Sequence, residues 1–241
     1  MGGRLTLSQP RNGFRAGLDS VLLGASVPAG TGGLLDLGAG IGAAGLVALA
    51  LGRAERAVLA ERDAGALALA RDNIAGNGLA GRAEALSVDI TAKAEERRAA
   101  GLLDNGYDAV IANPPFFAAA RGTRAARADR ADARHMAAGT LDLWMRCAAA
   151  SAVAGGTAIF IYPAEGLAEL LAAFDQRFGA LNVLPLAPRP GAVASRVLVR
   201  GHKGSRAGLT LLATRCLHGA TGHGFAPDFE AIFRGQAALD W

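Results

Sequence analysis

The sequence predicts an α/β fold: a doubly wound, mostly parallel sheet of seven strands with helices on both faces and an antiparallel hairpin near the C-terminus. Three observations predict it. Short apolar runs alternate with longer helical segments, as in consecutive strand–helix units. The early runs end in glycine, acidic or asparagine residues, at the edge where parallel sheets bind ligands. The length of 241 residues fits one large domain, which we place at residues 1–241.

The elements follow in order along the chain. Asp63 is expected to cap the helix after the second strand, and Gly78 is expected to end it. The late runs 195–200 and 209–216 are expected to pair as the antiparallel hairpin. The expected strands are residues 34–37, 57–60, 85–88, 107–112 and 157–162, and the expected helices are residues 43–51, 64–77, 141–153 and 164–178, the last closed by Gly179.

Composition excludes several classes of protein. No run of 18 uncharged apolar residues occurs, so no membrane span is expected, and the start lacks the apolar core of a signal peptide. Cys147 and Cys216 give neither a disulfide framework nor a metal-ligand spacing. These features predict a cytoplasmic protein with no metal and no membrane partner. The net charge of +4 permits a polyanionic partner without requiring one.

The turn after the first strand has the pattern of a nucleotide-cofactor site. Gly38, Gly40 and Gly42 follow a strand and open a helix, and glycine lets the backbone pass close to a ligand. Glu61 ends the next strand, with Arg62 beside it, and a carboxylate there can accept both ribose hydroxyls of an adenosine cofactor. The same pattern satisfies a relaxed dinucleotide fingerprint, so it does not by itself choose between S-adenosylmethionine and NAD.

Two further acids favour S-adenosylmethionine. Asp36 lies at the end of the first strand, where it can meet the ammonium of a methionine moiety. Asp89 ends the third strand and can accept from an adenine amino group, while Ile90 can cover the ring. Taken singly, each acid is better explained as a helix cap or a solvated strand end. Their occurrence at successive strand ends indicates a cofactor site.

A compact polar and aromatic motif follows the apolar run 107–112. Asn113 supplies one carbonyl acceptor and two amide donors. Pro114 and Pro115 fix the backbone, so that their carbonyls point in set directions, and Phe116 supplies a flat face. Such a site can hold an amino group by two acceptors and stack the ring that carries it. We expect all four residues to act in catalysis, with Asn113 also contacting the cofactor; the alternative is a plain proline turn.

The series of acid, glycine turn, acid, acid and Asn-Pro-Pro resembles the Rossmann-like class I S-adenosylmethionine-dependent methyltransferases, and its last motif resembles their amino-group members. The run Gln9–Leu23 resembles the opening of the tRNA(Val) adenine-37 N6-methyltransferase family. That resemblance implies that residues 1–30 cover the cofactor with Phe14, Arg15 and Asp19, and that Arg15 meets the cofactor carboxylate. The alternative is a helix capped by Asp19, with Arg15 as a surface charge.

Arginines recur every three or four residues after the motif. On a helix they would form one cationic stripe, and on a loop a basic lid; either can neutralise phosphates. We expect residues 117–139 to form such a basic loop; the alternative is a solvated charged segment. The candidate nucleic-acid-binding residues are Arg121, Arg124, Arg127, Arg130, Arg134, His135, Lys203 and Arg206.

Together these features predict an S-adenosylmethionine-dependent methyltransferase that modifies the exocyclic N6 amino group of an adenine in tRNA or another structured RNA. Three alternatives stay open: a protein glutamine N5 methyltransferase, a small-molecule O- or N-methyltransferase, and a non-catalytic or NAD-dependent protein. The sequence specifies neither the RNA nor the oligomeric state.

Overall fold

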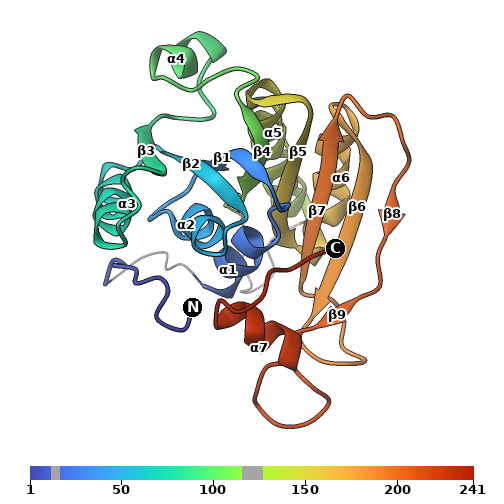
Figure 1. The fold of residues 1–241 in the computed structure, drawn as a ribbon. Coiled ribbons are helices and arrows are strands. Elements are labelled where there is room, and N and C mark those ends of the chain that lie inside the picture. Colours follow the sequence, from blue (N-terminus) through green and yellow to red (C-terminus); the bar gives the residue numbers. More distant parts are fainter. Residues whose placement is uncertain (12–16, 116–126) are drawn as a thin grey trace.

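The computed structural model describes residues 1–11, 17–115 and 127–241, with the backbone alone for residues 127–138. Its described part forms one nine-stranded sheet (Figure 1). The strands are β1 Thr31–Leu37, β2 Ala54–Glu61, β3 Ala83–Ser87, β4 Tyr107–Ala112, β5 Ala152–Pro163, β6 Phe178–Ala187, β7 Arg196–Lys203, β8 Thr210–Leu211 and β9 Arg215–Cys216. The helices are α1 Leu18–Ala25, α2 Ala43–Ala50, α3 Ala64–Gly76, α4 Ala94–Ala99, α5 Arg127–Ser151, α6 Leu167–Asp175 and α7 Pro227–Phe233, with a 3₁₀ turn at Ala164–Gly166.

The strand order is β3-β2-β1-β4-β5-β7-β6-β8, and the first five strands run parallel. β2 lies on one side of β1 and β4 on the other, so the order reverses between β1 and β4. Ala112, the last residue of β4, pairs with Leu37, the last residue of β1. Ligands of doubly wound sheets bind outside the carboxyl ends of strands at this reversal. The predicted fold class is confirmed.

Burial on both faces explains why the central strands read as continuous apolar runs. In β4, Ala109 and Ile111 join the core packed under α1, α2, α3 and α7, while Val110 and Ala112 join the core under α5 and α6. Their alternation follows the period of two in a strand. The sheet is therefore covered on both sides, and its ends remain for ligands.

The predicted boundaries of α3 are confirmed. Asp63 precedes the helix, and its Oδ1 accepts a hydrogen bond from the Ala66 backbone N–H at 2.7 Å. This satisfies one of the unpaired donors of the first turn. Gly78, just beyond the helix, adopts a φ of +67°, a conformation that glycine reaches without steric cost.

The predicted pairing of the late hairpin is wrong, although a hairpin is present. β7 lies between β5 and β6, antiparallel to both, and the short β8 and β9 pair with β6 in parallel. The segment 164–178 ends its helix early, at Asp175, and β6 begins at Phe178. Gly179 belongs to this strand: a Cβ there would lie 2.2 Å from the Ser205 carbonyl oxygen. The glycine permits a close backbone approach and does not close a helix.

The last residues of the chain pack on elements from its first quarter. The Leu239 N–H donates to the Ala25 carbonyl at 2.9 Å. Asp240 forms an ion pair with Arg53 at 2.6 Å. The C-terminal segment thereby joins the end of α1 to the start of β2. No helix in the described part of the chain is both long and apolar enough to cross a bilayer.

Candidate cofactor and methyl-transfer site

Side chains pack against the glycine turn at two of its glycines, and its middle glycine has no such neighbour among the described residues. Gly38, Gly40 and Gly42 have φ angles of +61°, +57° and +83°, which other residues rarely adopt. A Cβ on Gly38 would lie 2.3 Å from the Trp144 ring of α5, and one on Gly42 would lie 2.6 Å from Leu59 Cδ1. A Cβ on Gly40 would meet no atom of the described residues within 4 Å. The turn therefore exposes backbone at Gly40, where a cofactor can approach.

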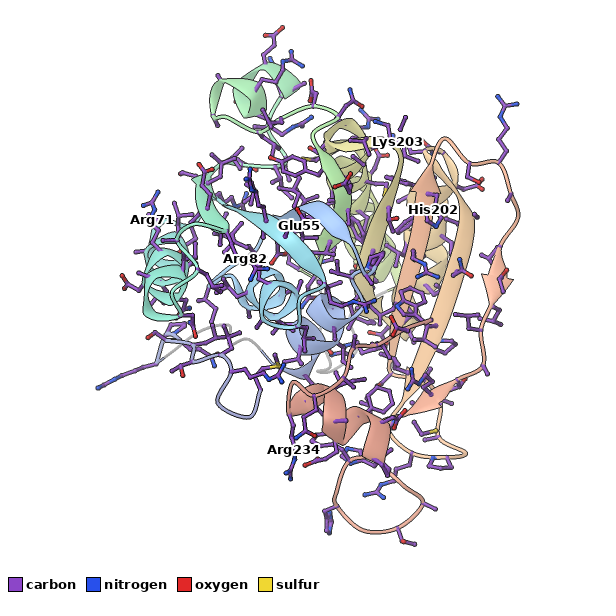
Figure 2. All side chains as sticks on the ribbon, in the orientation of Figure 1. Glu55, Arg71, Arg82, His202, Lys203 and Arg234 are labelled. Carbon is purple, nitrogen blue, oxygen red and sulfur yellow. The ribbon has the colours of Figure 1, made fainter. Side chains whose placement is uncertain are left out.

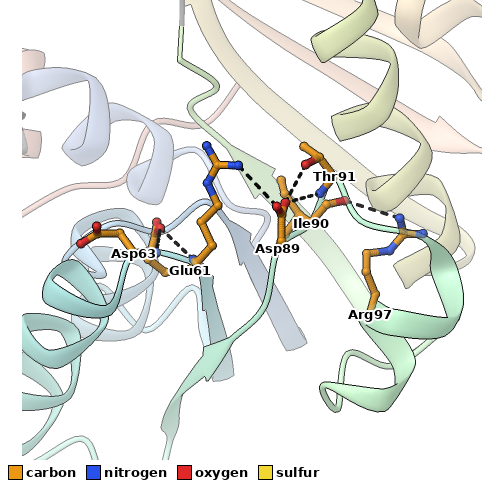
Figure 3. A network of polar contacts seen from close by, with 7 residues as sticks. Glu61, Asp63, Asp89, Ile90, Thr91 and Arg97 are labelled. Carbon is orange, nitrogen blue, oxygen red and sulfur yellow. Dashed lines mark hydrogen bonds and ion pairs between the residues drawn. The ribbon is translucent and has the colours of Figure 1, made fainter.

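Glu61 joins this turn to the start of α3, and Figure 3 shows its bonds at the start of that helix. Its Oε2 accepts from the Gly40 N–H at 2.9 Å, and its Oε1 accepts from the N–H groups of Arg62 and Asp63, both at 2.8 Å. A carboxylate offers about four lone-pair positions, so three backbone donors leave room for one more. Glu61 thus lies where the sequence predicts a ribose-binding acid, and it also holds the turn in shape.

Asp36 lies beneath the turn, 2 % exposed. Its Oδ2 accepts from the Gly45 N–H of α2 at 2.9 Å. Burial, and to a lesser extent the nearby Glu61 charge, raises the pKa of Asp36 from 3.8 to about 7, although the Gly45 bond opposes the rise. The predicted contact with a methionine ammonium remains a prediction; what the structure adds is that Asp36 holds the first turn of α2 against β1.

Replacing Asp36 with asparagine should stabilise the fold in a pH-dependent way. Between about pH 4 and pH 7 the unfolded chain ionises Asp36 while the folded chain keeps its proton, so the free energy of unfolding falls as the pH rises. The neutral Asn avoids this loss and can still accept from the Gly45 N–H. Relative to the wild type, Asp36→Asn should gain up to about 4 kcal/mol by pH 8 and far less at pH 4. Denaturant unfolding at both values checks this, and a difference independent of pH would contradict it.

Asp89 lies two residues beyond the end of β3 and turns the chain locally. Its Oδ1 accepts from the Thr91 N–H at 2.8 Å and from the Thr91 hydroxyl at 2.6 Å, and its Oδ2 lies 3.4 Å from Arg62 Nη1 (Figure 3). The Thr91 hydroxyl is the main cause that lowers the pKa of Asp89. Ile90 is 5 % exposed and packs in the core with Val88 and Leu102. Asp89, Arg62 and Glu61 therefore share one side of the site.

Asn113 follows β4 next to the glycine turn, since Ala112 pairs with Leu37 and Gly38 comes directly after it. Asn113 is half-buried, Pro114 is buried and Pro115 is exposed. Asn113 thus lies at the carboxyl end of its strand, beside the strand reversal, and its role in catalysis remains a prediction. Phe116 lies outside the described residues.

The N-terminal candidates are described only in part. Asp19 lies in the first turn of α1, whose N-cap is Gly17, and forms an ion pair with Arg196 at 2.8 Å. Arg196 opens β7 opposite Pro163, at the carboxyl end of β5. Asp19 therefore lies at the same end of the sheet as Asn113, with an arginine partner that the sequence did not reveal. Phe14 and Arg15 lie outside the described residues.

The nucleic-acid candidates fall into separate places. Arg127, Arg130, Arg134 and His135 lie on α5, so this part of the expected basic loop is helical, whereas Arg121 and Arg124 lie outside the described residues. Lys203 donates to Asn105 Oδ1 and to the Ala152 carbonyl, each at 2.7 Å.

Lys203 does not share an end of the sheet with Asn113. It bonds to the carbonyl of Ala152, the first residue of β5, and the labelled side chains of Lys203 and His202 lie at the end of β7 far from α7 (Figure 2). Arg206 follows in the same connection. Lys203 therefore lies beside the C-terminal end of α5, whereas Arg127 and Arg130 lie at the start of this helix.

Sequence reasoning missed Asn73, which is 2 % exposed. Its amide contacts Ser8 and the Ile41 carbonyl of the glycine turn. The available signal was its position on the buried side of α3, with Ala70 and Ile74, because a buried amide must find hydrogen-bond partners.

An open glycine turn, an acid at the next strand end and Asn-Pro-Pro at the strand reversal define a class I methyltransferase. Residues 17–141 match the model of the methyltransferase small domain, and the chain belongs to this family. The chain is therefore a methyltransferase.

Solved structures agree with this assignment. A predicted O-methyltransferase, protein Atu636 from Agrobacterium tumefaciens, is 35% identical, with a TM-score of 0.78 over 92% of this chain and 99% of that one. TrmN from Thermus thermophilus is 20% identical, with a TM-score of 0.52 over 77% and 48% of the two chains. The tRNA (m1A58) methyltransferase TrmI from Aquifex aeolicus is 16% identical, with a TM-score of 0.54 over 82% and 72%. No curated protein sequence matches the chain.

This class implies S-adenosylmethionine as the methyl donor, and the residues present fit it. In the part of the chain that the structure describes, nothing contacts the position of a Cβ on Gly40, so a ligand can approach the backbone there. Glu61 keeps acceptor capacity beside that position, and Asp89 and Arg62 line the same side. Among the described residues, no three His, Cys, Asp or Glu side chains gather as a metal site.

Proposed function

We propose that the enzyme transfers a methyl group from S-adenosylmethionine to the exocyclic N6 amino group of an adenine in tRNA. The observation that carries the proposal is the position of Asn113, Pro114 and Pro115. They leave β4 beside Gly38, at the strand reversal. An amino group bound by Asn113 would face the space above the glycine turn.

The chain's own residues prepare the acceptor nitrogen. S-Adenosylmethionine, when bound, supplies a methyl group on a positively charged sulfur. An adenine amino group is a weak nucleophile because its lone pair is delocalised into the ring. The side-chain carbonyl of Asn113 and the backbone carbonyl of Pro114 can accept its two N–H bonds and so favour a more pyramidal nitrogen. Phe116 supplies a face on which the base can stack. The remaining task is alignment at about 3–3.5 Å, with the extra proton leaving to water.

Support for an RNA acceptor comes from the sequence. The run Gln9–Leu23 resembles the tRNA(Val) adenine-37 N6-methyltransferase family. Arg127, Arg130 and Arg134 are spaced three and four residues apart on α5, and this spacing places them along one side of a helix. The same helix carries Trp144, which packs against Gly38. A cation stripe on α5 would thus approach the site from the carboxyl end of β4.

Methyl transfer from radiolabelled S-adenosylmethionine tests the proposal. Bulk tRNA, protein extract and small-molecule extract serve as parallel acceptors, with a ribonuclease-treated sample as control. We expect label in tRNA that digests to N6-methyladenosine. The Agrobacterium relative is described as a predicted O-methyltransferase, so label in a ribose 2′-O-methyl nucleoside would favour a hydroxyl acceptor. Label in protein or in small molecules alone would overturn the RNA assignment.

Replacing Arg124, Arg127 and Arg130 with alanine should weaken tRNA binding and flatten its salt dependence, because each lost phosphate contact lowers the slope of log K against log salt by about one. Affinity for S-adenosylhomocysteine should not change. Filter binding over a salt series measures both quantities. Arg56, Arg71 and Arg98 are exposed residues outside the stripe, and their triple alanine variant removes the same charge. Equal slopes for the two triple variants would show that the stripe contacts no RNA.

A further inference from the structure

The N-terminal segment lies along α3 and is held by two asparagines one turn apart. Asn77 Oδ1 accepts from the Thr6 N–H at 2.9 Å, and its Nδ2 donates to the Thr6 carbonyl at 2.7 Å. Asn73 binds Ser8 in the same way, at 2.7 and 3.1 Å. Four helical residues rise about 6 Å, and two extended residues span about 6.6 Å. The two amides therefore match alternate residues of an extended segment, as the backbone of a neighbouring strand would.

The two asparagines differ in one contact. The Asn73 Nδ2 also donates to the Ile41 carbonyl at 3.0 Å, whereas the Asn77 Nδ2 donates to the Asn73 carbonyl within its own helix at 2.7 Å. Ile41 stands between Gly40 and Gly42, both of which have positive φ angles. The Asn73 bond therefore fixes the peptide group between Ile41 and Gly42 in the middle of the cofactor turn.

Without the Asn73 amide, this turn would keep its glycines but lose an anchor. The Ile41 carbonyl would be left without its bond from Asn73, and leaving a buried polar group unpaired is unfavourable. Because glycine has no strong conformational preference, the peptide group could rotate to find another partner. That rotation would disturb the Gly40 N–H, which Glu61 holds from the other side at 2.9 Å. Asn73 and Glu61 thus fix the turn at adjacent residues.

We propose that Asn73 is a positioning residue for cofactor binding, and that it couples docking of residues 5–9 to occupation of the glycine turn. A single buried amide contacts both parts, so a ligand that stabilises the turn also stabilises the Asn73 orientation that binds Ser8. By reciprocity, docking of the segment strengthens cofactor binding by the same factor. The proposal rests on cofactor binding at this turn and is independent of the identity of the methyl acceptor.

Asn77 provides a matched control, since it binds the same segment but does not touch the turn. Asn73→Ala should weaken S-adenosylhomocysteine binding about tenfold, within the usual range of coupling between sites, and Asn77→Ala should weaken it much less. Isothermal titration calorimetry measures both affinities. Thermal unfolding of the two variants reports the loss of stability that a purely structural role predicts. Equal affinities for the two variants would overturn the proposal.

Hydrogen exchange tests the coupling in the wild type and does not depend on how well a variant folds. Saturating S-adenosylhomocysteine should slow exchange of the Thr6 and Ser8 amides, which donate to Asn77 and Asn73. In Asn77→Ala the slowing should persist at Ser8, and in Asn73→Ala it should disappear. A Ser8 amide exchange rate that is the same with and without S-adenosylhomocysteine in the wild type would overturn the coupling. Neither measurement involves methyl transfer, so failure of the RNA assignment would leave both results interpretable.

Discussion

Asn113→Ala should lower the single-turnover rate of methyl transfer by roughly 10²-fold or more, a loss similar to that of one aligned catalytic hydrogen bond. The substitution removes an acceptor that we assign to the reacting amino group. It leaves in place Asp36, Glu61 and Asp89, whose contacts are with other parts of the site. The effect should therefore fall on the chemical step, with S-adenosylhomocysteine affinity changed far less.

Rapid-quench measurement with the enzyme in excess over tRNA gives the single-turnover rate. Calorimetry gives the affinity for S-adenosylhomocysteine. Asn105→Ala is a suitable control, because Asn105 bonds to Lys203 at the other end of the sheet. It should retain the wild-type rate. An Asn113→Ala enzyme that methylates tRNA at a near wild-type rate would remove Asn113 from the mechanism. That result would also remove the main reason to prefer an amino group over a hydroxyl as the methyl acceptor.

Glu61→Ala should lose on the order of 2–3 kcal/mol of S-adenosylhomocysteine binding, the usual worth of hydrogen bonds to a charged group. Two effects contribute. A ribose hydroxyl loses its acceptor, and the Gly40 N–H loses the carboxylate that holds it at 2.9 Å. Titration calorimetry measures the loss. An unchanged affinity would exclude Glu61 from the cofactor site.

Glu61→Gln separates the two effects, because glutamine keeps one acceptor oxygen and loses the charge. Three backbone N–H groups donate to the two carboxylate oxygens of Glu61 in the wild type. A glutamine amide has only one acceptor oxygen, and its NH2 group cannot accept from the remaining N–H. We expect Glu61→Gln to bind the cofactor better than Glu61→Ala and less well than the wild type. Tight NAD binding by the wild type, with no S-adenosylhomocysteine binding, would contradict the cofactor assignment.

The elements best predicted from the sequence are those determined by burial on both faces or by a local cap. β4 reads as a strand because Ala109 and Val110 alternate between two apolar cores, and α3 is predicted by a local cap at Asp63. β6 was missed because the segment before it is apolar and helical as far as Asp175, and because Gly179 suggests a helix end. Gly179 in fact allows the backbone of β6 to approach Ser205, which lies 26 positions further along the chain.

The candidate site shows the same division. Gly40, Glu61 and Asn113 were predictable because parallel strands bring their carboxyl ends to one edge. The hydrogen bonds from the Gly40 N–H to Glu61 and from the Ser8 N–H to Asn73 join residues 21 and 65 positions apart, so no local sequence pattern predicts them. Asp36 is predictable in its position but not in its contacts. Its position was predictable, but its partner Gly45 and its burial follow from how α2 packs on the sheet.

The contacts of Leu239 and Asp240 with residues near α1 have a consequence during synthesis. Asp240 pairs with Arg53 across 187 positions, and Leu239 bonds to Ala25. Contacts of such separation raise the contact order and slow folding. During synthesis the apolar side of α1 stays uncovered until residues 239 and 240, more than 200 positions after it, have left the ribosome. We expect this stage to be the most prone to aggregation, and chains interrupted before residue 239 to depend on chaperones for solubility.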